Sequence, residues 1–367
     1  MTTPLAPGVS VIEKSSGTHL ITGVGTSTAA FVATGVDGDP QQLQSWNSFG
    51  AVYLDPKATT KVSAAVQEAV YGFFANGGTE CWVVPDGTDT GGKAPDRLAL
   101  LDVSIVAAPD LTTAVAYQTL VTHCATMRNR VMIVTLPDDT YTPSEPVAPV
   151  LGAGKNYAAV YYPYLKGPGS TGTSQTISPC GYIAGVWARV DAQRGVFKAP
   201  ANEVLNGVTA LTQTLSDTTL ASFYGVGVNC LRVFPGTGPL VWGARTAAAS
   251  SDSDNVYLNV RRLLCFLEES IRRATTWAVF EPNDDRLWAS LRGTVGTFLT
   301  EQWRQGALMG QTPTQAFAIT CDSTNNTPAI INAGQVVCDI AVAPVRPAEY
   351  VTFTVTQQNP ATPATAG

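Results

Sequence analysis

The chain has 367 residues, a net charge of −6, and a composition that is 45% hydrophobic and only 14% charged. This acidic balance argues against nucleic acid as a partner, because phosphate binding needs a basic face. The length can support about two domains with cores of their own. The low charged fraction is compatible with an ordinary domain rich in Ala, Gly and Thr, or with a surface that partner subunits cover.

Hydrophobic residues and cysteines are spread along the chain. Because no run of about 18 apolar residues occurs, we expect no membrane span. The first residues lack a basic start followed by an apolar core, so we expect no secretion signal and folding in the cytoplasm. The cysteines form no CxxC pair, which argues against a metal site or a disulfide framework and favours buried thiols in a reducing compartment. They are Cys81, Cys124, Cys180, Cys230, Cys265, Cys321 and Cys338.

The first half of the chain alternates predicted strands and helices. After an extended arm over residues 1–20 we expect a strand over 21–32, and apolar spacing predicts a helix over 61–76 that stops at a Gly-Gly pair. Further predicted elements are a strand at 81–85, a helix over 113–128, and strands over 131–136 and 158–164. Strands separated by helices indicate an α/β layer with a mostly parallel sheet.

The second half contains the longer predicted helices. Predicted in order are a flexible surface loop over 166–179, a helix over 181–193, a strand over 228–234, a helix over 256–273, a strand over 278–280 and a helix that ends near Leu308. Asn283 or Asp284 is expected to cap the last of these helices. The strand-like segments FAITCD, VVCDIAVAPV and EYVTFTVTQ follow, and we expect the closing NPATPATAG to be disordered.

Residues that could carry catalysis are few. His19 falls in the predicted arm, and His123 lies beside Cys124 in a predicted helix, where adjacent positions cannot form a Cys–His pair. The segment GVGTST at 23–28 lacks the Gly-Lys-Ser/Thr ending of a phosphate-binding loop. We therefore expect structural or surface roles for both histidines, and no nucleotide site.

Carboxylates gather at Glu268, Glu269, Glu281, Asp284 and Asp285, and such a group could supply an acid and a base. The favoured interpretation is that Glu268 and Glu269 pair with Arg272 and Arg273 at i,i+4 spacing, and that the two aspartates stabilise the first turn of a helix. Arg189, Asp191 and Arg194 are likewise interpreted as ion pairs at a helix end. No catalytic residues, cofactor or metal ligands are predicted.

Both ends of the chain carry strand-like segments. VSV near the start and EYVTFTVTQ near the end could pair within their own monomer, or they could add to the sheet of another chain, since an unpaired strand exposes a row of donors and acceptors. The residues alone leave these two alternatives open.

Several long motifs resemble the contractile phage-tail sheath family, which includes the sheaths of R-type pyocins and extracellular contractile injection systems. They are APGVSVIE at 6–13, AVYGFFANGGTECWVV at 69–84, CGYIAGVWARVDAQRGVFKAPANEVLNGV at 180–208, the block from 234 to 303, and VAPVRPAEYVTFTVTQ at 342–357. Ser10 stands where the family usually has an aromatic residue, and the resemblance is weakest between about residues 86 and 178.

The resemblance implies a structural protein and not an enzyme. It implies a sheath-type α/β fold with a linking arm at 1–20, an outer domain at 21–249, an inner domain at 250–347, and a C-terminal arm and tail at 348–367. Subunits of this family form stacked hexameric rings around an inner tube, with baseplate and cap proteins as further partners. They belong to a phage tail or tail-like particle assembled in the bacterial cytoplasm.

Two sets of site residues follow from the resemblance. Strands that link neighbouring subunits would be formed by Pro7, Gly8, Val9, Val11, Glu13, Glu349, Tyr350, Val351, Thr352, Phe353 and Val355. Charges that could face the tube are Arg261, Arg262, Arg292 and Arg304, although solvated faces explain them equally well. The alternatives to a main sheath subunit are a paralogue that forms a baseplate- or cap-proximal ring, and a soluble α/β enzyme.

Overall fold

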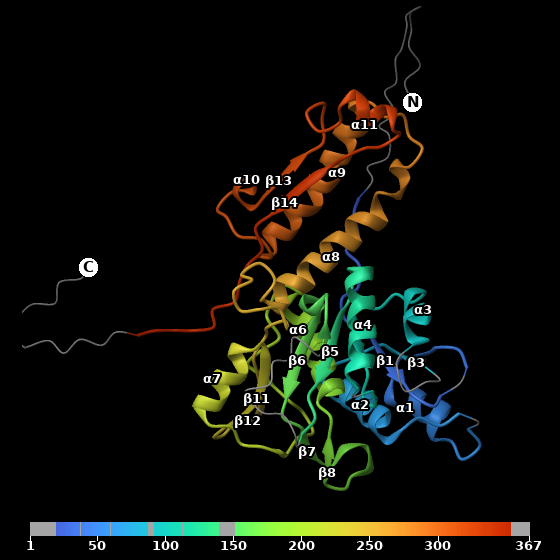
Figure 1. The fold of residues 1–367 in the computed structure, drawn as a ribbon, viewed down its shortest axis with the longest axis vertical. Helices are drawn as coiled ribbons and strands as arrows, with labels where there is room; N and C mark the ends of the chain where they lie inside the picture. Colours follow the sequence, from blue (N-terminus) through green and yellow to red (C-terminus); the bar gives the residue numbers. More distant parts are fainter. Residues whose placement is uncertain are drawn as a thin grey trace, which may run out of the picture.

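The computed structural model describes residues 20–36, 38–58, 60–86, 92–111, 113–138 and 151–353. These form a large body and a smaller C-terminal unit that projects from it (Figure 1). The longest helices of the C-terminal unit, α8 (Leu258–Ala274) and α9 (Asp285–Arg304), run side by side in this view, and α8 leads from the body into the unit.

A nine-stranded sheet forms the centre of the body, in the order β2-β3-β1-β4-β5-β6-β11-β12-β9. Six neighbouring strands, from β3 to β11, are parallel, and the remaining three at the two edges are antiparallel. Every residue of β1, β5 and β6 is buried, as expected for parallel strands covered on both faces. The predicted α/β class with a mostly parallel sheet is therefore confirmed. The strands are β1 (Ala29–Ala33), β2 (Gln41–Leu43), β3 (Cys81–Pro85), β4 (Ile105–Ala107), β5 (Val131–Thr135), β6 (Ala158–Tyr162), β9 (Glu203–Val204), β11 (Val228–Phe234) and β12 (Gly238–Trp242).

Two pairs of helices cover the sheet. Helix α2 (Ala64–Ala75) packs on α6 (Cys180–Arg194), and α3 (Ala94–Ala99) packs on α4 (Ala114–Met127). Right-handed crossovers place α2, which connects β1 with β3, on the opposite face of the sheet from α3 and α4, which connect β3 with β4 and β4 with β5. Helix α6 lies on the face of α2, against which it packs. The body also contains α1 (Trp46–Phe49), a π-helical turn (Gly50–Leu54), short 3₁₀ turns (Lys155–Tyr157 and Gly169–Thr171) and α7 (Asp217–Gly225).

The C-terminal unit combines α8 and α9 with a two-stranded antiparallel sheet. Leu263, Leu267, Val295, Phe298 and Leu299 of the two helices form most of its core. Its further elements are a 3₁₀ turn (Thr276–Ala278), α10 (Pro313–Ala316), β13 (Phe317–Thr320), α11 (Pro328–Asn332) and β14 (Asp339–Val342). The aromatic and branched residues of β13 and β14 pack against the helices, so the unit has one layer of helices and one of strands.

The segment 166–179, predicted to be a flexible loop, is instead part of a small antiparallel sheet, in which β7 (Leu165–Gly167) pairs with β8 (Gln175–Ile177) and with β10 (Ala210–Leu211). The buried Glu68 on α2 accepts a hydrogen bond of 2.9 Å from the backbone N–H of Ser170. The prediction was wrong because this partner lies 102 residues away in the sequence.

The predicted strand over 21–32 is confirmed only in its last residues, since β1 begins at Ala29, and the predicted strand over 278–280 is wrong. Residues 21–28 run extended beside α8 and form no strand, and residues 278–280 form the end of a 3₁₀ helix and a turn. Phe280 in this turn has a left-handed backbone (φ 72°) and is fully exposed, which explains why a β-rich sequence does not form a strand there. No helix among the described residues is both long and apolar enough to cross a bilayer.

Candidate functional site

Helix α8 is joined to the body by a buried ion pair. Arg262 donates to both oxygens of Asp191 on α6, at 2.9 and 2.6 Å, and each side chain is only 3% exposed. The guanidinium also lies over the ring of Trp187, 4.7 Å from its centroid. Burial raises the pKa of Asp191, and the charge of Arg262 opposes that rise. Asp191 therefore does not form the predicted pair at the end of its own helix.

Arg261 is buried next to this pair. Its guanidinium lies over the ring of Tyr157, 4.6 Å from the centroid, and donates to the Tyr157 hydroxyl at 3.2 Å. Only 7% of Arg261 is exposed. The prediction that Arg261 and Arg262 are surface charges that face a tube is thus corrected. Both residues lie on the side of α8 that packs on the body, and the body covers both guanidinium groups.

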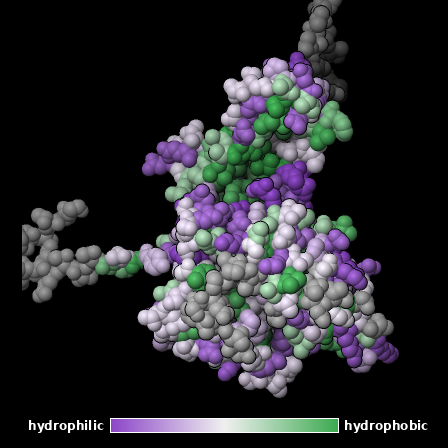
Figure 2. Space-filling view, viewed as in Figure 1, coloured by the Kyte–Doolittle hydropathy of each residue, from purple (hydrophilic) through white to green (hydrophobic). Residues whose placement is uncertain are grey.

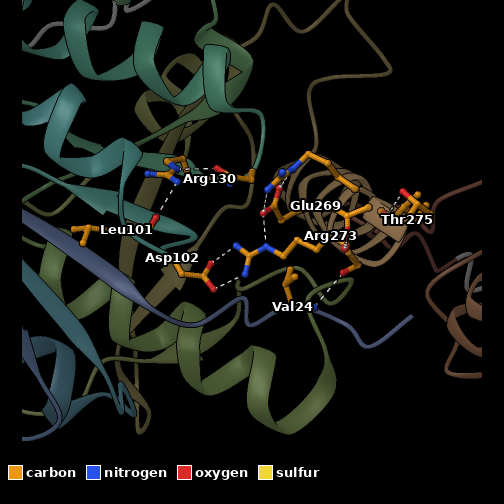
Figure 3. A network of polar contacts seen from close by, with 12 residues as sticks. Val24, Leu101, Asp102, Arg130, Glu269, Arg273 and Thr275 are labelled. Atoms are coloured by element: carbon orange, nitrogen blue, oxygen red, sulfur yellow. Dashed lines mark hydrogen bonds and ion pairs between the residues drawn. The ribbon is translucent and has the colours of Figure 1, made fainter. Parts of the chain in front are cut away.

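A second, more exposed network fixes the far end of α8 to the body, as Figure 3 shows. Arg273 donates two hydrogen bonds of 2.6 Å to Asp102, and it also contacts Glu269, which binds Arg272 as well. Burial raises the pKa of Glu269, but the hydrogen bonds from the two arginines outweigh it, so the net shift is downward. Close by, the N–H of Val24 donates to Ser270 Oγ at 3.1 Å, which ties the extended residues before β1 to the same helix.

One of the two predicted i,i+4 ion pairs on α8 forms and the other does not. Glu269 binds Arg273 as predicted. Glu268 instead lies 3.3 Å from Arg128 of the body, and Arg272 binds Glu269 at i,i+3 spacing. The reason is that Glu268 faces the body, so a partner distant in sequence replaces the local one.

The two remaining arginines of the predicted set lie on α9. Arg292 is half-buried and donates to the carbonyl oxygen of Cys321, whereas Arg304 is exposed in the last turn of the helix. Asp284 caps the other end of α9, as expected, by accepting from the N–H groups of Arg286 and Leu287 at 3.0 Å each. Contact of Arg292 or Arg304 with a tube stays a prediction.

The sheet formed by β13 and β14 has only these two strands among the described residues, so neither outer edge is paired with a further described strand. Ile319 and Ile340 face the helices, while Ala318 and Ala341 on the other face are exposed. Figure 2 shows apolar side chains gathered on the C-terminal unit, in the region where Figure 1 places α8, α9 and β14. An open strand edge beside an apolar surface is suited to accepting another strand.

The C-terminal segment leaves the body after a second contact. Glu349 forms an ion pair with Arg245, in which the side chains are 11% and 13% exposed respectively. The next residues of the predicted arm form no strand: Tyr350, Val351 and Phe353 are 78%, 70% and 86% exposed, and Thr352 is exposed as well. Pro7, Gly8, Val9, Val11, Glu13 and Val355 of the predicted linking strands lie outside the described residues.

Groups that could carry chemistry are dispersed or buried. Burial, with the charge of nearby Arg130, lowers the pKa of His123 to about 4, which keeps its ring neutral. Six of the seven cysteines are buried free thiols, as predicted, and Cys338 is half-buried. In the described ranges no group of three or more His, Cys, Asp or Glu side chains is placed to hold a metal ion.

Sequence reasoning missed the contacts that organise this region. Arg262 and Asp191 are 71 residues apart, and Arg245 and Glu349 are 104 residues apart. No periodicity or local spacing indicates such pairs. The only signal in the sequence was the occurrence of charged residues inside otherwise apolar segments.

Two family descriptions match most of the chain. Residues 93–247 match the phage tail sheath protein central domain, and residues 250–358 match the phage tail sheath C-terminal domain. The boundary between the two matches falls just before α8.

The curated relatives are longer proteins of which this chain matches a part. The tail sheath protein of Vibrio phage KVP40 is 28% identical over 176 residues, which cover 47% of this chain and 25% of that protein. The tail sheath protein of Enterobacteria phage T4 is 28% identical over 175 residues, with the same two shares of 47% and 25%. The alignment thus spans one quarter of the length of each of these two relatives.

Solved structures match over nearly the whole length. The contracted sheath complex of PVC, an extracellular contractile injection system, superposes with a TM-score of 0.81 at 28% identity and covers 98% of this chain and 99% of that chain. The contracted helical sheath of the anti-feeding prophage gives a TM-score of 0.80 at 28% identity, covering 97% and 100%. A chain in the anti-feeding prophage baseplate gives 0.79, with 28% identity and the same coverage of 97% and 100%.

Proposed function

Because the chain belongs to the phage tail sheath family, we propose that it is a structural subunit of a contractile sheath that polymerises as stacked hexameric rings around an inner tube. Contraction from a metastable extended state would drive the tube through a target envelope. The observation that carries this proposal is the match along 98% of the chain to a subunit of a contracted injection-system sheath.

The proposed partners are further copies of this chain, an inner tube protein, and baseplate and cap proteins. Nucleic acid and direct membrane insertion are not part of the proposal, in keeping with the net charge of −6. The particle is a phage tail or a tail-like structure that is assembled in the bacterial cytoplasm. Its inner face would be the C-terminal unit, with Arg292 and Arg304 of α9 as candidate contacts to the tube.

Linkage between copies is proposed to use the two ends of the chain. Residues 7–13 and 350–355 would add as strands to the open edges of β13 and β14 in neighbouring copies. The support is physical. The edges lack a described strand partner and an apolar surface lies beside them, while Tyr350, Val351 and Phe353 of the arm are exposed hydrophobic residues. Strand pairing keeps register while the exposed parts of the arm bend, so copies could reorient and stay connected.

The energy of contraction is proposed to come from interfaces that are better packed in the contracted state, without nucleotide hydrolysis. A packing change between two stable arrangements is an established way for an assembly to switch. Residues 21–249 would form the outer part of the assembled sheath, and residues 250–347 the inner part.

Truncation of each arm tests the proposal. Deleting residues 1–15, or the chain after Glu349, is expected to leave a folded monomer by circular dichroism and to abolish sheaths in negative-stain micrographs. Deleting only residues 359–367 is the matched control and is expected to allow sheaths. Normal sheaths from both arm truncations would contradict the linkage.

A second candidate function is a specialised ring next to the baseplate. It is favoured by the match to a chain in the anti-feeding prophage baseplate, whose TM-score of 0.79 is close to the 0.81 of the sheath match. Long polymers of the purified chain would support the main sheath, whereas single rings that do not stack would support the specialised one.

A further inference from the structure

The root of the C-terminal arm is held by a three-residue clasp that consists of Tyr224, Arg245 and Glu349. Arg245 Nε and Nη2 donate to the two carboxylate oxygens of Glu349 at 3.0 and 2.5 Å, and the Tyr224 hydroxyl donates to the same carboxylate. The guanidinium also lies 3.9 Å from the centroid of the Tyr224 ring and donates to the Tyr224 carbonyl at 3.3 Å. Each of the three guanidinium nitrogens of Arg245 thus donates to Glu349 or to Tyr224.

Arg245 is itself attached to the central sheet. Asn229 on β11 is fully buried, and its side chain accepts from the Arg245 N–H at 2.7 Å and donates to the Arg245 carbonyl at 2.8 Å. The same amide donates to the carbonyl of Val160 on β6 at 3.1 Å. A continuous series of hydrogen bonds thus leads from two parallel strands to the carboxylate of Glu349.

A second anchor holds the segment four residues earlier. The buried Asn259 on α8 donates to the Val345 carbonyl at 3.0 Å, and the Val345 N–H donates to the Ala307 carbonyl at 3.2 Å. One anchor alone would let the segment rotate about it. Two anchors, at Val345 and Glu349, define a direction.

Between the anchors the segment does not pack tightly on the body. It forms one wall of a groove of about 890 Å³, whose opposite side includes Phe197, Tyr224 and Trp242. Beyond Glu349, residues 350–353 have no described hydrogen bond or ion pair, and three of them are at least 70% exposed. Packing therefore contributes little to the direction of the segment, and the two anchors contribute most.

We propose that the clasp of Tyr224, Arg245 and Glu349, together with the Asn259 anchor, sets the direction in which the C-terminal arm leaves the body, and that the arm pivots at Tyr350. Glu349 then belongs to the body and is not part of the linking strand. This inference rests on the proposed function of the arm as a connector. In a polymer, each copy would present its arm to a neighbour in one orientation, and any bending would be confined to the residues that follow the clasp.

The charge state of the clasp agrees with this role. Burial raises the pKa of Glu349, but the hydrogen bonds from Arg245 and Tyr224 outweigh it and leave the pKa below its ordinary value. Burial works against the charge of Arg245, and its contacts with Glu349 more than compensate, which raises its pKa. Both partners are thus charged at neutral pH.

A distance measurement on the full-length chain tests the proposal directly. Spin labels are placed at Ala348→Cys, in the segment held between the two anchors, and at Ser222→Cys on α7, both exposed positions, in a Cys338→Ser background. Double electron–electron resonance on the monomer is expected to give one narrow distance peak. Glu349→Ala is expected to replace that peak with a broad distribution, and Tyr224→Phe, which removes one hydrogen bond, to broaden it partially.

The matched control is Arg346→Gln, which breaks the exposed ion pair of 3.2 Å with Asp254 on the same segment. It is expected to leave the peak narrow. A narrow peak that persists in Glu349→Ala, with an unchanged melting temperature, would overturn the proposal. If Glu349→Ala fails to fold, Tyr224→Phe and Glu349→Gln take its place. A peak as narrow as that of the wild type in both of these variants would also overturn the proposal.

The distance measurement on the clasp and the truncation test of the proposed function can fail independently of each other. If the arm links copies but the clasp does not direct it, arm truncation abolishes sheaths while Glu349→Ala keeps the narrow peak. If the clasp directs the arm but the arm links nothing, Glu349→Ala broadens the peak while truncated chains still form sheaths. If both are right, Glu349→Ala also lowers the yield of sheaths, and Arg346→Gln does not.

Discussion

Arg262 and Asp191 show how strongly burial affects the contribution of an ion pair to stability. Both are almost fully buried, whereas Arg273 and Asp102, which also join α8 to the body, are 39% and 66% exposed. Removing one member of a buried pair leaves a charge without a partner, while an exposed pair is screened by water. The two pairs join the same helix to the same body, so they can be compared directly.

We predict that Arg262→Leu lowers the free energy of unfolding by about 3–5 kcal/mol, because Asp191 then stays buried without its charged partner. Asp102→Asn is the control and is expected to lower it by about 1 kcal/mol or less. Urea denaturation measures both. Replacing both Arg262 and Asp191 by leucine is expected to restore much of the loss, and equal effects of the two single variants would contradict this account.

His123 on α4 is predicted to make stability depend on pH. Its pKa is lowered to about 4 by burial and by the charge of Arg130, so the unfolded chain binds the proton more readily than the folded one. The contribution of neutral His123 to the free energy of unfolding is therefore complete above the unfolded pKa of about 6.5. It is lost as the pH falls toward the folded pKa. The expected slope reaches at most about 1.4 kcal/mol per pH unit.

Urea denaturation between pH 7 and pH 5 measures this slope. Burial raises the pKa of Asp110 and Asp191, so the comparison with a variant that lacks only the imidazole separates the contribution of His123 from theirs. His123→Gln keeps a polar side chain of similar size without the titrating group, and its stability is expected to vary less with pH. An unchanged slope in that variant would show that other groups cause the dependence.

At the scale of elements, helices α2 and α6 approach so closely that glycine is required at the crossing. A Cβ added at Gly181 would overlap the backbone of Ala69, and one at Gly185 would lie 2.5 Å from the carbonyl oxygen of Phe73. By contrast, a Cβ at Gly293 in the middle of α9 would meet nothing within 4 Å.

We predict opposite effects for the same substitution at these two sites. Gly181→Ala is expected to destabilise the chain by about 1–3 kcal/mol or more, because the two helices must separate. Gly293→Ala is expected to stabilise it by up to about 1 kcal/mol, because alanine favours the helix and meets no obstacle. Thermal denaturation measures both, and a loss at Gly293 would mean that this face of α9 is not free.

The elements that sequence patterns predicted are those whose periodicity extends over several turns or a full buried strand. Helices α2, α4, α6, α8 and α9, and strands β3, β5, β6 and β11, lie close to their predicted bounds. Strands β2, β9 and β10 have only two or three residues, too few to show a period, and sheet pairing alone defines them. The strand predicted over 21–32 exists only from Ala29 on, and the one predicted over 278–280 does not form, because no described strand pairs with residues 21–27 or 278–280.

At the scale of the whole molecule, α8 belongs to two cores at once. Leu258 and Cys265 lie in the core of the body, whereas Leu263 and Leu267 lie in the core of the C-terminal unit. The family matches meet just before this helix, at residues 247 and 250. The boundary between the two family matches therefore does not separate two units with independent cores.

We therefore predict that the described body and C-terminal unit unfold together. Calorimetry of the full-length chain is expected to show one main transition that coincides with the loss of helical circular dichroism. Arg262→Leu is expected to shift this transition to lower temperature without splitting it. Two separate transitions in the unaltered chain would show that the C-terminal unit melts on its own.

The sequence by itself determined the α/β class, the main helices and parallel strands, the burial of most cysteines and the resemblance to tail sheath proteins. These properties follow from local periodicity and from motifs that are contiguous in the chain. Only the tertiary structure decided that Arg261 and Arg262 are buried, that Glu268 binds Arg128, and that Glu349 is held by Arg245. Each of these depends on residues that are distant in sequence, because the strength of a charge contact is set by the partner and the solvent around it after folding.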